Sequence, residues 1–323
     1  MPENQALWYV GENRAELRSE PMPVPAVGQV IVKARFSGVS RGTERLVASG
    51  HVPLSEHSRM RCPHQAGEFS FPVKYGYALC GAIEDGPKKQ LGQRVFVLHP
   101  HQKFSRVAVS AAHLIPGDVP LRRAALAANM ETAVNVLWDA AVMPGEKVLV
   151  IGGGVLGLLI AGLLSRTHKN EVVVVDINPN RRTETEALGA SFMRPQDTLS
   201  EFSVVIHTSA TEDGLRRALE CAAPDGRIIE ASWFGDKKIA LPLGEAFHSR
   251  RLRIISSQVG AIPPSHRSRW TPAQRIQEAL SHLRDDKFDA LITNQIRFEE
   301  SSEKLPKLFA DGEKGLMTVL SYE

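Results

Sequence analysis

Three glycines in the middle of the chain have the spacing of a nucleotide-binding turn. An apolar strand predicted over residues 147–151 leads directly into Gly152, Gly154 and Gly157, in the pattern G-x-G-x-x-G. The first glycine permits a tight turn, the second lets a pyrophosphate approach the backbone, and the third brings helix and strand together. Asp176 ends the next predicted strand, where a carboxylate accepts hydrogen bonds from a ribose. The pattern predicts a dinucleotide site, and the alternative is a tight turn without a ligand.

The same region constrains which dinucleotide is bound. A carboxylate at Asp176 favours the free 2′-hydroxyl of NAD and repels the 2′-phosphate of NADP. Arg181 and Arg182 could partly offset that repulsion, or both could lie in a solvated first turn of a helix. We therefore expect NAD, with NADP as the alternative. The other cofactor contacts that we expect are Val155, Leu156, Thr132 and Ser209.

Strands and helices alternate around this turn. The predicted strands are 147–151, 171–175, 204–206, 227–230 and 252–256, and the predicted helices are 158–164, 181–188 and 214–222. This alternation predicts a parallel sheet with helices on both faces. The segments Ser232–Gly235 and Ser257–Gly260 follow strands, at the sheet edge where ligands bind, although Trp233 and Phe234 could instead pack at a subunit contact.

The rest of the chain has a different pattern. The first 110 residues are β-rich, with residues 29–36 alternating apolar and polar, and 77–83 and 94–98 as further strands. Residues 121–142 predict one alanine-rich helix. The last part predicts a helix over 272–283, a strand over 295–298, a helix over 302–309 and a strand over 315–321. The fold class is therefore α/β, with a β-rich part before the parallel sheet.

Composition narrows the functional classes. The chain has 323 residues, enough for two domains, with 43% hydrophobic and 23% charged residues and a net charge of +3. The basic residues are dispersed, so we expect no nucleic-acid partner, and no apolar run suits a membrane span. Three cysteines lie far apart and no secretory signal pattern is present. We expect a cytoplasmic protein.

Several stretches resemble the medium-chain dehydrogenase/reductase superfamily, which contains alcohol dehydrogenases and quinone reductases. They are residues 28–44, 75–86, 91–98, 143–159, 172–190, 223–232 and 314–320. Residues 37–50 (SGVSRGTERLVASG) are similar to the branch around hydroxyethyl bacteriochlorophyllide dehydrogenase. The resemblance implies a GroES-like catalytic domain over 1–125, a doubly wound Rossmann domain over 126–265, and a C-terminal return over 266–323 that completes the catalytic domain. It also implies hydride transfer with a nicotinamide cofactor and assembly as a dimer or tetramer, of which we expect a homodimer.

The departures from the superfamily concern zinc. Where its zinc-dependent members have ligands, this chain has Ser40, Tyr77 and Ala128, and the four-cysteine lobe is missing. None of these three is a usual zinc ligand, so we expect no catalytic zinc. Cys62, His64, His99 and His101 could form a replacement site, but ordinary loop histidines and an ordinary cysteine are favoured, because a metal needs several ligands at set distances.

Without zinc, another group must donate a proton or hydrogen bond to the reacting oxygen. Tyr77 is the best candidate, and Lys74 could lower its pKa if the two side chains converge. Tyr77 could equally fill the space left by zinc. His99 and His101 have pKa values suited to a proton shuttle, although plain loop residues are favoured.

Two further groups of polar residues are candidates for the active site. Ser40, Arg41, Thr43 and Glu44 are expected to line the pocket, unless Glu44 and Arg45 form a local ion pair. Asn129, Glu131 and Thr132 are expected near the nicotinamide, unless Glu131 caps a helix and Thr132 is buried.

Three functions fit these residues. The first is a zinc-independent, NAD(H)-dependent oxidoreductase that interconverts an alcohol and a carbonyl. The second is an NADPH-dependent quinone or enone reductase. The third is a protein that binds the dinucleotide without turnover, because fold alone does not establish activity.

Overall fold

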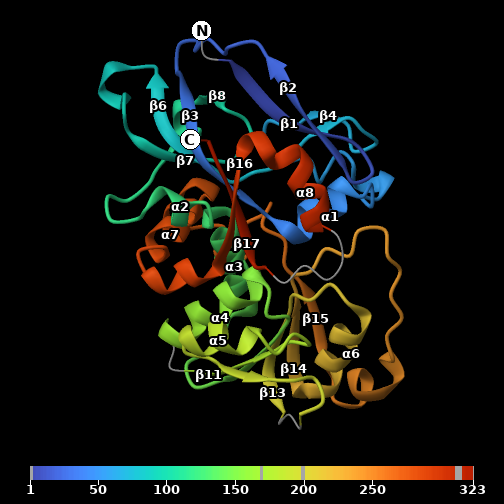
Figure 1. The fold of residues 1–323 in the computed structure, drawn as a ribbon. Coiled ribbons are helices and arrows are strands. Elements are labelled where there is room, and N and C mark those ends of the chain that lie inside the picture. The colour runs from blue at the N-terminus through green and yellow to red at the C-terminus, as the bar shows by residue number, and fades with distance from the viewer. Residues whose placement is uncertain (1–2, 168–169, 198–200, 310–314, 323) are drawn as a thin grey trace. The chain divides into compact units, whose positions relative to one another are not determined.

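The chain forms two compact units, each with its own hydrophobic core. The computed structural model describes residues 3–167, 170–197, 201–309 and 315–322 (Figure 1). The first unit comprises Met1–Ala128 and Ile292–Glu323, and the second comprises Asn129–Leu291.

The first unit consists of two sheets and short helices. One sheet has the strand order β2-β1-β5-β4, and the other has the order β16-β17-β3-β6-β7-β9, with β8 also pairing with β3. The strands are β1 (Asn4–Gly11), β2 (Arg14–Glu20), β3 (Gln29–Val39), β4 (Ala66–Gly67), β5 (Val73–Lys74), β6 (Leu79–Asp85), β7 (Arg94–Val97), β8 (Phe104–Ala108), β9 (His113–Leu114), β16 (Ile292–Arg297) and β17 (Met317–Ser321). The helices are α1 (Arg41–Ala48), α2 (Leu121–Ala124) and α8 (Ser301–Phe309).

The C-terminal strand completes this unit. Strand β17 pairs antiparallel with β3, from Thr318 opposite Val39 to Ser321 opposite Phe36. Strand β3 carries Val30, Val32 and Ala34 into a core that also includes Leu79 and Val95. Alternation of apolar residues thus turns one face of β3 inward, as its sequence predicts.

The second unit is built on one parallel sheet. Its strand order is β12-β11-β10-β13-β14-β15, which is the doubly wound order with a switch point between β10 and β13. The strands are β10 (Lys147–Ile151), β11 (Glu171–Val175), β12 (Ser191–Met193), β13 (Phe202–His207), β14 (Ala222–Glu230) and β15 (Arg253–Ser256). The helices are α3 (Ala127–Ala140), α4 (Val155–Thr167), α5 (Arg181–Ala187), α6 (Glu212–Cys221) and α7 (Pro272–His282).

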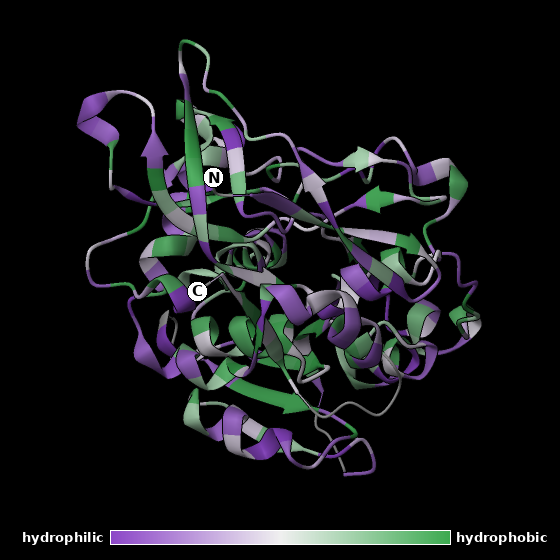
Figure 2. Cartoon of the chain, turned by 45° about the horizontal axis from the view of Figure 1, so that its top comes forward, coloured by the Kyte–Doolittle hydropathy of each residue, from purple (hydrophilic) through white to green (hydrophobic). Residues whose placement is uncertain are grey.

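Figure 1 shows α4 beside β11 and α6 beside β13 and β14, and these pairs are in contact. The inner strands are runs of valine, leucine and isoleucine because helices cover both faces of the sheet, and such apolar elements appear green in Figure 2. The predicted fold class, a β-rich GroES-like part with a Rossmann sheet, is confirmed.

Two differences between the structure and the predicted elements have a local physical reason. The helix predicted over 121–142 is two helices, α2 and α3. Ala125 and Leu126 bond to carbonyls three residues back, Arg122 and Arg123, and this tighter turn ends α2. The short strand β12 has no counterpart among the predicted strands, because three residues give too little alternation to detect.

Residues 266–291 belong to the second unit, whereas the sequence assigns them to the C-terminal return. The cause is a buried polar cluster that fixes α7 to α3. Arg275 Nε donates to Glu131 Oε1 at 3.0 Å, and the same guanidinium bonds Asn135. The side chains of Arg275 and Glu131 are only 3% and 6% exposed. Glu131 is thus an ion-pair partner and not a helix cap.

Across the described residues, no helix combines the length and the apolar character that crossing a membrane requires.

Candidate functional site

Each of the three glycines in the turn occupies its position for a different structural reason. Gly152 has φ +108, and a Cβ there would lie 2.8 Å from Thr208 Oγ1. A Cβ on Gly157 would lie 2.0 Å from the carbonyl oxygen of Gly152, so the helix packs directly on the turn. A Cβ on Gly154 would meet nothing within 4 Å. The open space lies over Gly154, where close approach of a ligand to the backbone is needed.

Helix α4 begins at Val155, directly after this open space. Val155 and Leu156 are partly exposed in its first turn, as two of the expected cofactor contacts. The first N–H groups of a helix have no partner within it, and they carry partial positive charge. The turn can therefore hold an anion such as a pyrophosphate.

Asp176 lies beside the turn, where the sequence predicts it. Its Oδ2 accepts from the N–H of Gly153 at 2.6 Å, and its Oδ1 accepts from the N–H of Asn178 at 2.7 Å. Arg181 is also adjacent, because a Cβ on Gly153 would lie 3.2 Å from Arg181 Cβ. The structure brings these groups together at the carboxyl end of β11.

A hydrogen-bonded cluster at the ends of β13 and β14 flanks the other side of Gly152. His207 lies opposite Glu230 in the ladder, with its Nδ1 2.7 Å from Glu230 Oε2. Its Nε2 is 2.7 Å from Ser209 Oγ. Phe234 stacks on the imidazole with ring centroids 6.0 Å apart. Phe234 therefore packs within its own unit.

The sequence pattern identifies Ser209 but neither His207 nor Glu230. Glu230 ends a predicted strand and His207 directly follows one, and these positions were the available signal. The two strands must also be neighbours in matched register, which only the sheet order establishes.

In the first unit, Tyr77 contacts two of the residues that are predicted to line the pocket. Its hydroxyl is hydrogen-bonded to the side chains of Ser40 and Thr43. The preceding residue must be glycine, because Gly76 has φ +121 and a Cβ there would lie 2.9 Å from the His101 ring. Burial raises the pKa of Tyr77 to about 12, although the bonds from Ser40 and Thr43 act to lower it. The phenol is therefore protonated at neutral pH.

Lys74 does not activate Tyr77. Its Nζ donates to both carboxylate oxygens of Glu20 and to Gln102 Oε1, each at 2.9 Å. The pKa of Tyr77 is raised and not lowered, so the idea that the two side chains converge is wrong. A carboxylate from β2 holds the ammonium elsewhere.

His99 and His101 lie in a loop, as predicted, but both are buried and not exposed at the surface. His101 is 0% exposed, with Nδ1 2.7 Å from Ser37 Oγ and Nε2 3.0 Å from Glu44 Oε2. Burial lowers the pKa of His99 to about 3, so this imidazole is neutral and unsuited to shuttling protons at neutral pH. Tyr9 completes the cluster by donating to Glu44 at 3.0 Å.

Glu44 also bonds the backbone of the turn that precedes α1. Its Oε1 accepts from the N–H of Ser40 at 2.8 Å. Because Ser40 also contacts Tyr77, the buried Glu44 fixes the turn that carries the Tyr77 partners.

The buried histidine makes stability depend on pH. The pKa of His99 falls from 6.5 to about 3 on folding, so the unfolded chain binds the extra proton. We expect the melting temperature to fall as pH decreases below about 6.5, and His99→Gln to reduce this dependence. The matched control is His51→Gln at an exposed position. An unchanged pH dependence in the His99 variant would contradict this.

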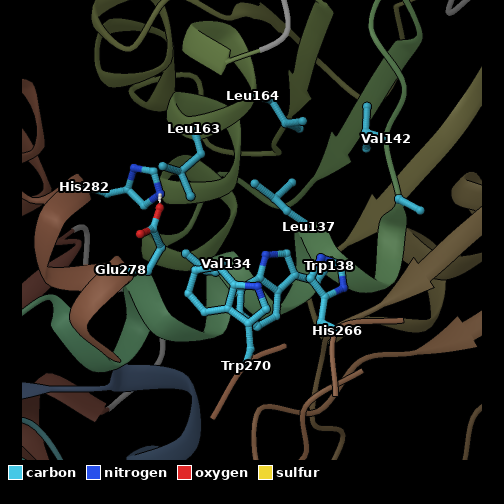
Figure 3. A pocket seen from close by; sticks show the side chains of 11 residues that line it. Val134, Leu137, Trp138, Val142, Leu163, Leu164, His266, Trp270, Glu278 and His282 are labelled. Atoms are coloured by element: carbon cyan, nitrogen blue, oxygen red, sulfur yellow. Dashed lines mark ion pairs between the residues drawn. The ribbon is translucent and has the colours of Figure 1, made fainter. Parts of the chain in front are cut away.

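Another cavity lies within the second unit and contains none of the predicted site residues. Its volume is about 330 Å³, and Figure 3 shows Leu137 and Leu163 facing Trp138 and Trp270 across it. Glu278 Oε1 lies 3.3 Å from His282 Nε2 along one side. Its walls are mostly aliphatic and aromatic, in contrast to the polar glycine turn.

The chain is similar to several curated dehydrogenases. Alcohol dehydrogenase 1 of Emericella nidulans is 30% identical over 225 residues, which cover 60% of this chain and 62% of that protein. L-galactonate-5-dehydrogenase of Escherichia coli is 26% identical, covering 51% of this chain and 54% of the other. The chain thus matches little more than half the length of these relatives. No protein-family model matches the sequence.

Solved structures match over nearly the whole chain. L-idonate 5-dehydrogenase from Escherichia coli superposes with a TM-score of 0.82 at 15% identity, covering 99% of both chains. An Escherichia coli alcohol dehydrogenase complexed with cofactor NADH has a TM-score of 0.79 at 18% identity, also covering 99% of both. A putative zinc-binding dehydrogenase from Sinorhizobium meliloti bound to NADP has a TM-score of 0.79 at 16% identity, covering 99% of this chain and 100% of the other.

The chain has the fold of these dehydrogenases, and its sequence is similar to theirs over half of its length or more, as the resemblance to the medium-chain dehydrogenase/reductase superfamily predicts.

The zinc site of this superfamily does not fit the residues present. The phenol of Tyr77 is bonded to the hydroxyls of Ser40 and Thr43, and Ala128 has no donor atom. Zinc requires thiolate, imidazole or carboxylate ligands, and this set offers none.

The other cysteine and histidine candidates also lack the features of a ligand set. Both nitrogens of His101 are hydrogen-bonded to groups of the protein, Ser37 and Glu44. The rings of His64 and His99 lie 4.9 Å apart. Within the ranges described, no three His, Cys, Asp or Glu side chains gather as a metal site would need.

Other residues that the sequence predicts near the cofactor lie on or after the elements where we expect them. Asn129 and Thr132 lie on α3, and Ser232 and Ser257 follow β14 and β15. The hydroxyl of Ser257 donates to Asp139 at 2.6 Å, and that of Ser232 accepts from the N–H of Ala210 at 3.1 Å. Contact of these residues with a nicotinamide stays a prediction.

Proposed function

We propose that the chain is a zinc-independent oxidoreductase that interconverts an alcohol and a carbonyl by hydride transfer, with NAD(H) as its preferred cofactor. The observation that carries the proposal is the glycine turn with open space over Gly154 and the Asp176 carboxylate beside it. The names of the relatives, alcohol dehydrogenase and sugar-acid dehydrogenase, support this class of reaction. Structural neighbours complexed with NADH and bound to NADP support a nicotinamide cofactor.

In this proposal, different residues bind the cofactor and donate the proton. Gly152, Gly154 and Gly157, with the first turn of α4, would hold the pyrophosphate, and Asp176 would hold the adenosine ribose. A bound nicotinamide supplies or accepts the hydride. Tyr77 donates the proton to the carbonyl oxygen as the alkoxide develops, and Ser40 and Thr43 orient its hydroxyl.

Absorbance of the reduced nicotinamide tests this directly. Purified protein is offered aldehydes, ketones and enones with NADH and NADPH, and alcohols with the oxidised forms. We expect carbonyl reduction with NADH. Reduction confined to enones or quinones with NADPH would favour the second function, and cofactor binding without turnover on any substrate would favour the third.

The acidity of Tyr77 predicts how rate depends on pH. A phenol with a pKa of about 12 keeps its proton up to that pH, so carbonyl reduction should show no loss from Tyr77 deprotonation at lower pH. Alcohol oxidation needs the phenolate, so its rate should rise about tenfold per pH unit below this pKa. The pH profile of kcat in both directions checks this, and a reduction rate that falls through neutral pH would contradict the role of Tyr77.

Asp176 predicts the cofactor preference. Asp176→Ser removes the carboxylate that would bind the ribose and that accepts from Gly153. We expect NAD(H) binding to weaken about tenfold or more, since a charge-assisted hydrogen bond contributes about 1.5–3 kcal/mol, while NADP(H) binding is maintained or improved. Asp197→Ser is the matched control, because Asp197 accepts from the N–H of Arg194 at 2.7 Å in another turn. Unchanged affinities for both cofactors in the Asp176 variant would refute this role.

We propose a homodimer in the cytoplasm. Strand β15 lies at the edge of the parallel sheet, and its Ile254 is 37% exposed, which supports pairing with a second copy. Sedimentation equilibrium would show a monomer if this part of the proposal is wrong.

A further inference from the structure

The cavity between α3, α4 and α7 has an aromatic wall. Trp138 of α3 stacks on His266 with ring centroids 4.5 Å apart and an interplanar angle of 6°. Trp270 tilts against the same indole, with centroids 4.9 Å apart. All three residues are partly exposed and line the cavity, so their rings are not sealed in a core. Figure 3 shows Leu163 of α4 across the cavity from the two indoles.

Hydrogen bonds of the segment before α7 hold this wall in place. The N–H of Trp270 donates to His266 O at 3.0 Å, which closes a helical turn between the two rings. Arg267 Nε donates to Ile262 O at 3.1 Å. Thr271 then begins α7 with a capping box. Because the wall is formed by the chain alone, a ligand that enters the cavity does not pay for ordering it.

A carboxylate lies at the other end of the cavity. Glu278 of α7 lines it, with Oε1 3.3 Å from His282 Nε2, and Figure 3 shows this pair on the side away from His266. Burial lowers the pKa of His282 below its usual value, so the imidazole is neutral at pH 7. The Glu278 end of the cavity therefore carries a net negative charge.

The other charged groups near the cavity offset one another. Arg166 acts on His282, but its NH1 group is paired with Asp285 Oδ2 at 2.6 Å. Burial also lowers the pKa of His266, while Asp139 acts to raise it and the exposed Arg269 to lower it further. These opposite charges leave the carboxylate at the α7 end as the net charge of the site.

We propose that this cavity binds a small organic cation, a protonated amine attached to a flat aromatic ring. The ring packs between the two indoles and the aliphatic side chains of α3 and α4. The ammonium group lies against Glu278, where indole faces also attract positive charge. At about 330 Å³ the cavity has the size of a site for a small ligand. The inference is independent of the proposed oxidoreductase function, because none of the expected cofactor or catalytic residues lines this cavity.

The test uses three ligands that share an indole ring and differ in charge. Tryptamine is a cation, indole-3-acetamide is neutral and indole-3-acetate is an anion. Isothermal titration calorimetry of the full chain at pH 7 gives the Kd of each. We expect tryptamine to bind about fivefold more tightly than the amide, and the acetate to bind most weakly, because a partly exposed carboxylate attracts the first and repels the last.

Two variants locate the site. Glu278→Gln keeps the shape of the side chain and removes its charge, so tryptamine should weaken about fivefold while the amide is unaffected. Glu186→Gln is the matched control, because Glu186 also pairs with a residue four positions away, Arg182 at 3.1 Å, on a helix outside the cavity. Trp270→Leu should weaken both tryptamine and the amide about three- to tenfold through the loss of an aromatic contact.

The possible failures point to different errors. Wild type that binds none of the three ligands overturns the site, and equal affinity for tryptamine and the amide overturns the cationic class. Tryptamine binding that is unchanged in both Glu278→Gln and Trp270→Leu places the cation elsewhere on the chain and also overturns the proposal. If Trp270→Leu does not fold, the partly exposed Glu278→Gln still decides through the difference between tryptamine and the amide.

Discussion

Gly157→Ala is expected to destabilise the protein by about 3 kcal/mol, the upper end of the usual cost of overpacking. The new Cβ would lie 2.0 Å from the carbonyl oxygen of Gly152, which is backbone and cannot move away as a side chain can. The turn or helix α4 must shift, and the N–H groups that would hold the pyrophosphate shift with it. Chemical denaturation gives the loss in unfolding free energy, and NADH titration gives the loss in affinity.

Gly154→Ala is the matched variant with a different expected result. Its Cβ would meet nothing within 4 Å, so the unfolding free energy should stay close to that of wild type. The same methyl group would occupy the space through which a pyrophosphate approaches the backbone, so NADH binding should weaken about tenfold or more as charge-assisted bonds are lost. If Gly154→Ala binds NADH as wild type does, the ligand does not lie over this turn.

Tyr77→Phe is expected to lower kcat for carbonyl reduction by about a hundredfold or more, the usual contribution of a general acid. The ring stays in place, but no proton can reach the developing alkoxide from this position. NADH affinity should be unchanged, because the dinucleotide turn belongs to the second unit. Single-turnover and steady-state kinetics with NADH check the loss, and binding titration checks the cofactor.

Tyr75→Phe provides the control for this substitution. Tyr75 is 3% exposed, and its ring lies perpendicular to that of Tyr77 in a T-shaped contact, with centroids 6.0 Å apart. It loses the same atom in the same neighbourhood without touching Ser40 or Thr43, so its kcat should stay near that of wild type. Full turnover in Tyr77→Phe would remove the proposed acid, and equal losses in both variants would indicate disturbed packing.

Much of the second unit could be predicted from sequence because its signals are local. The strand over 171–175 and the start of α5 at Arg181 lie where the apolar runs and polar turns place them. The spacing of Gly152 and Gly157 also predicts why glycine is required at both positions, and the structure confirms both close contacts. The assignment of residues 266–291 to the second unit depends on Arg275 reaching Glu131, a long-range pairing that no local pattern encodes.

The burial and the hydrogen-bond partners of polar residues in the first unit could not be predicted from the sequence. Composition and loop position favoured exposed histidines, yet His99 and His101 are buried. The reason lies in partners distant in the chain: His101 meets Ser37 and Glu44 only when β3 and α1 pack against its loop. Proximity in sequence also suggested Lys74 as a neighbour of Tyr77, whereas Glu20 on another strand binds it.

The central claim is that a nicotinamide dinucleotide binds at the glycine turn and that hydride transfer proceeds without a catalytic cation. The most direct measurement is NADH-dependent carbonyl reduction by freshly purified protein, with metal content determined on the same sample before and after treatment with a strong chelator. We predict NADH binding, zinc far below one equivalent per chain, and a rate that the chelator does not change. Stoichiometric zinc together with loss of activity on chelation, or the absence of any dinucleotide binding, would contradict the account.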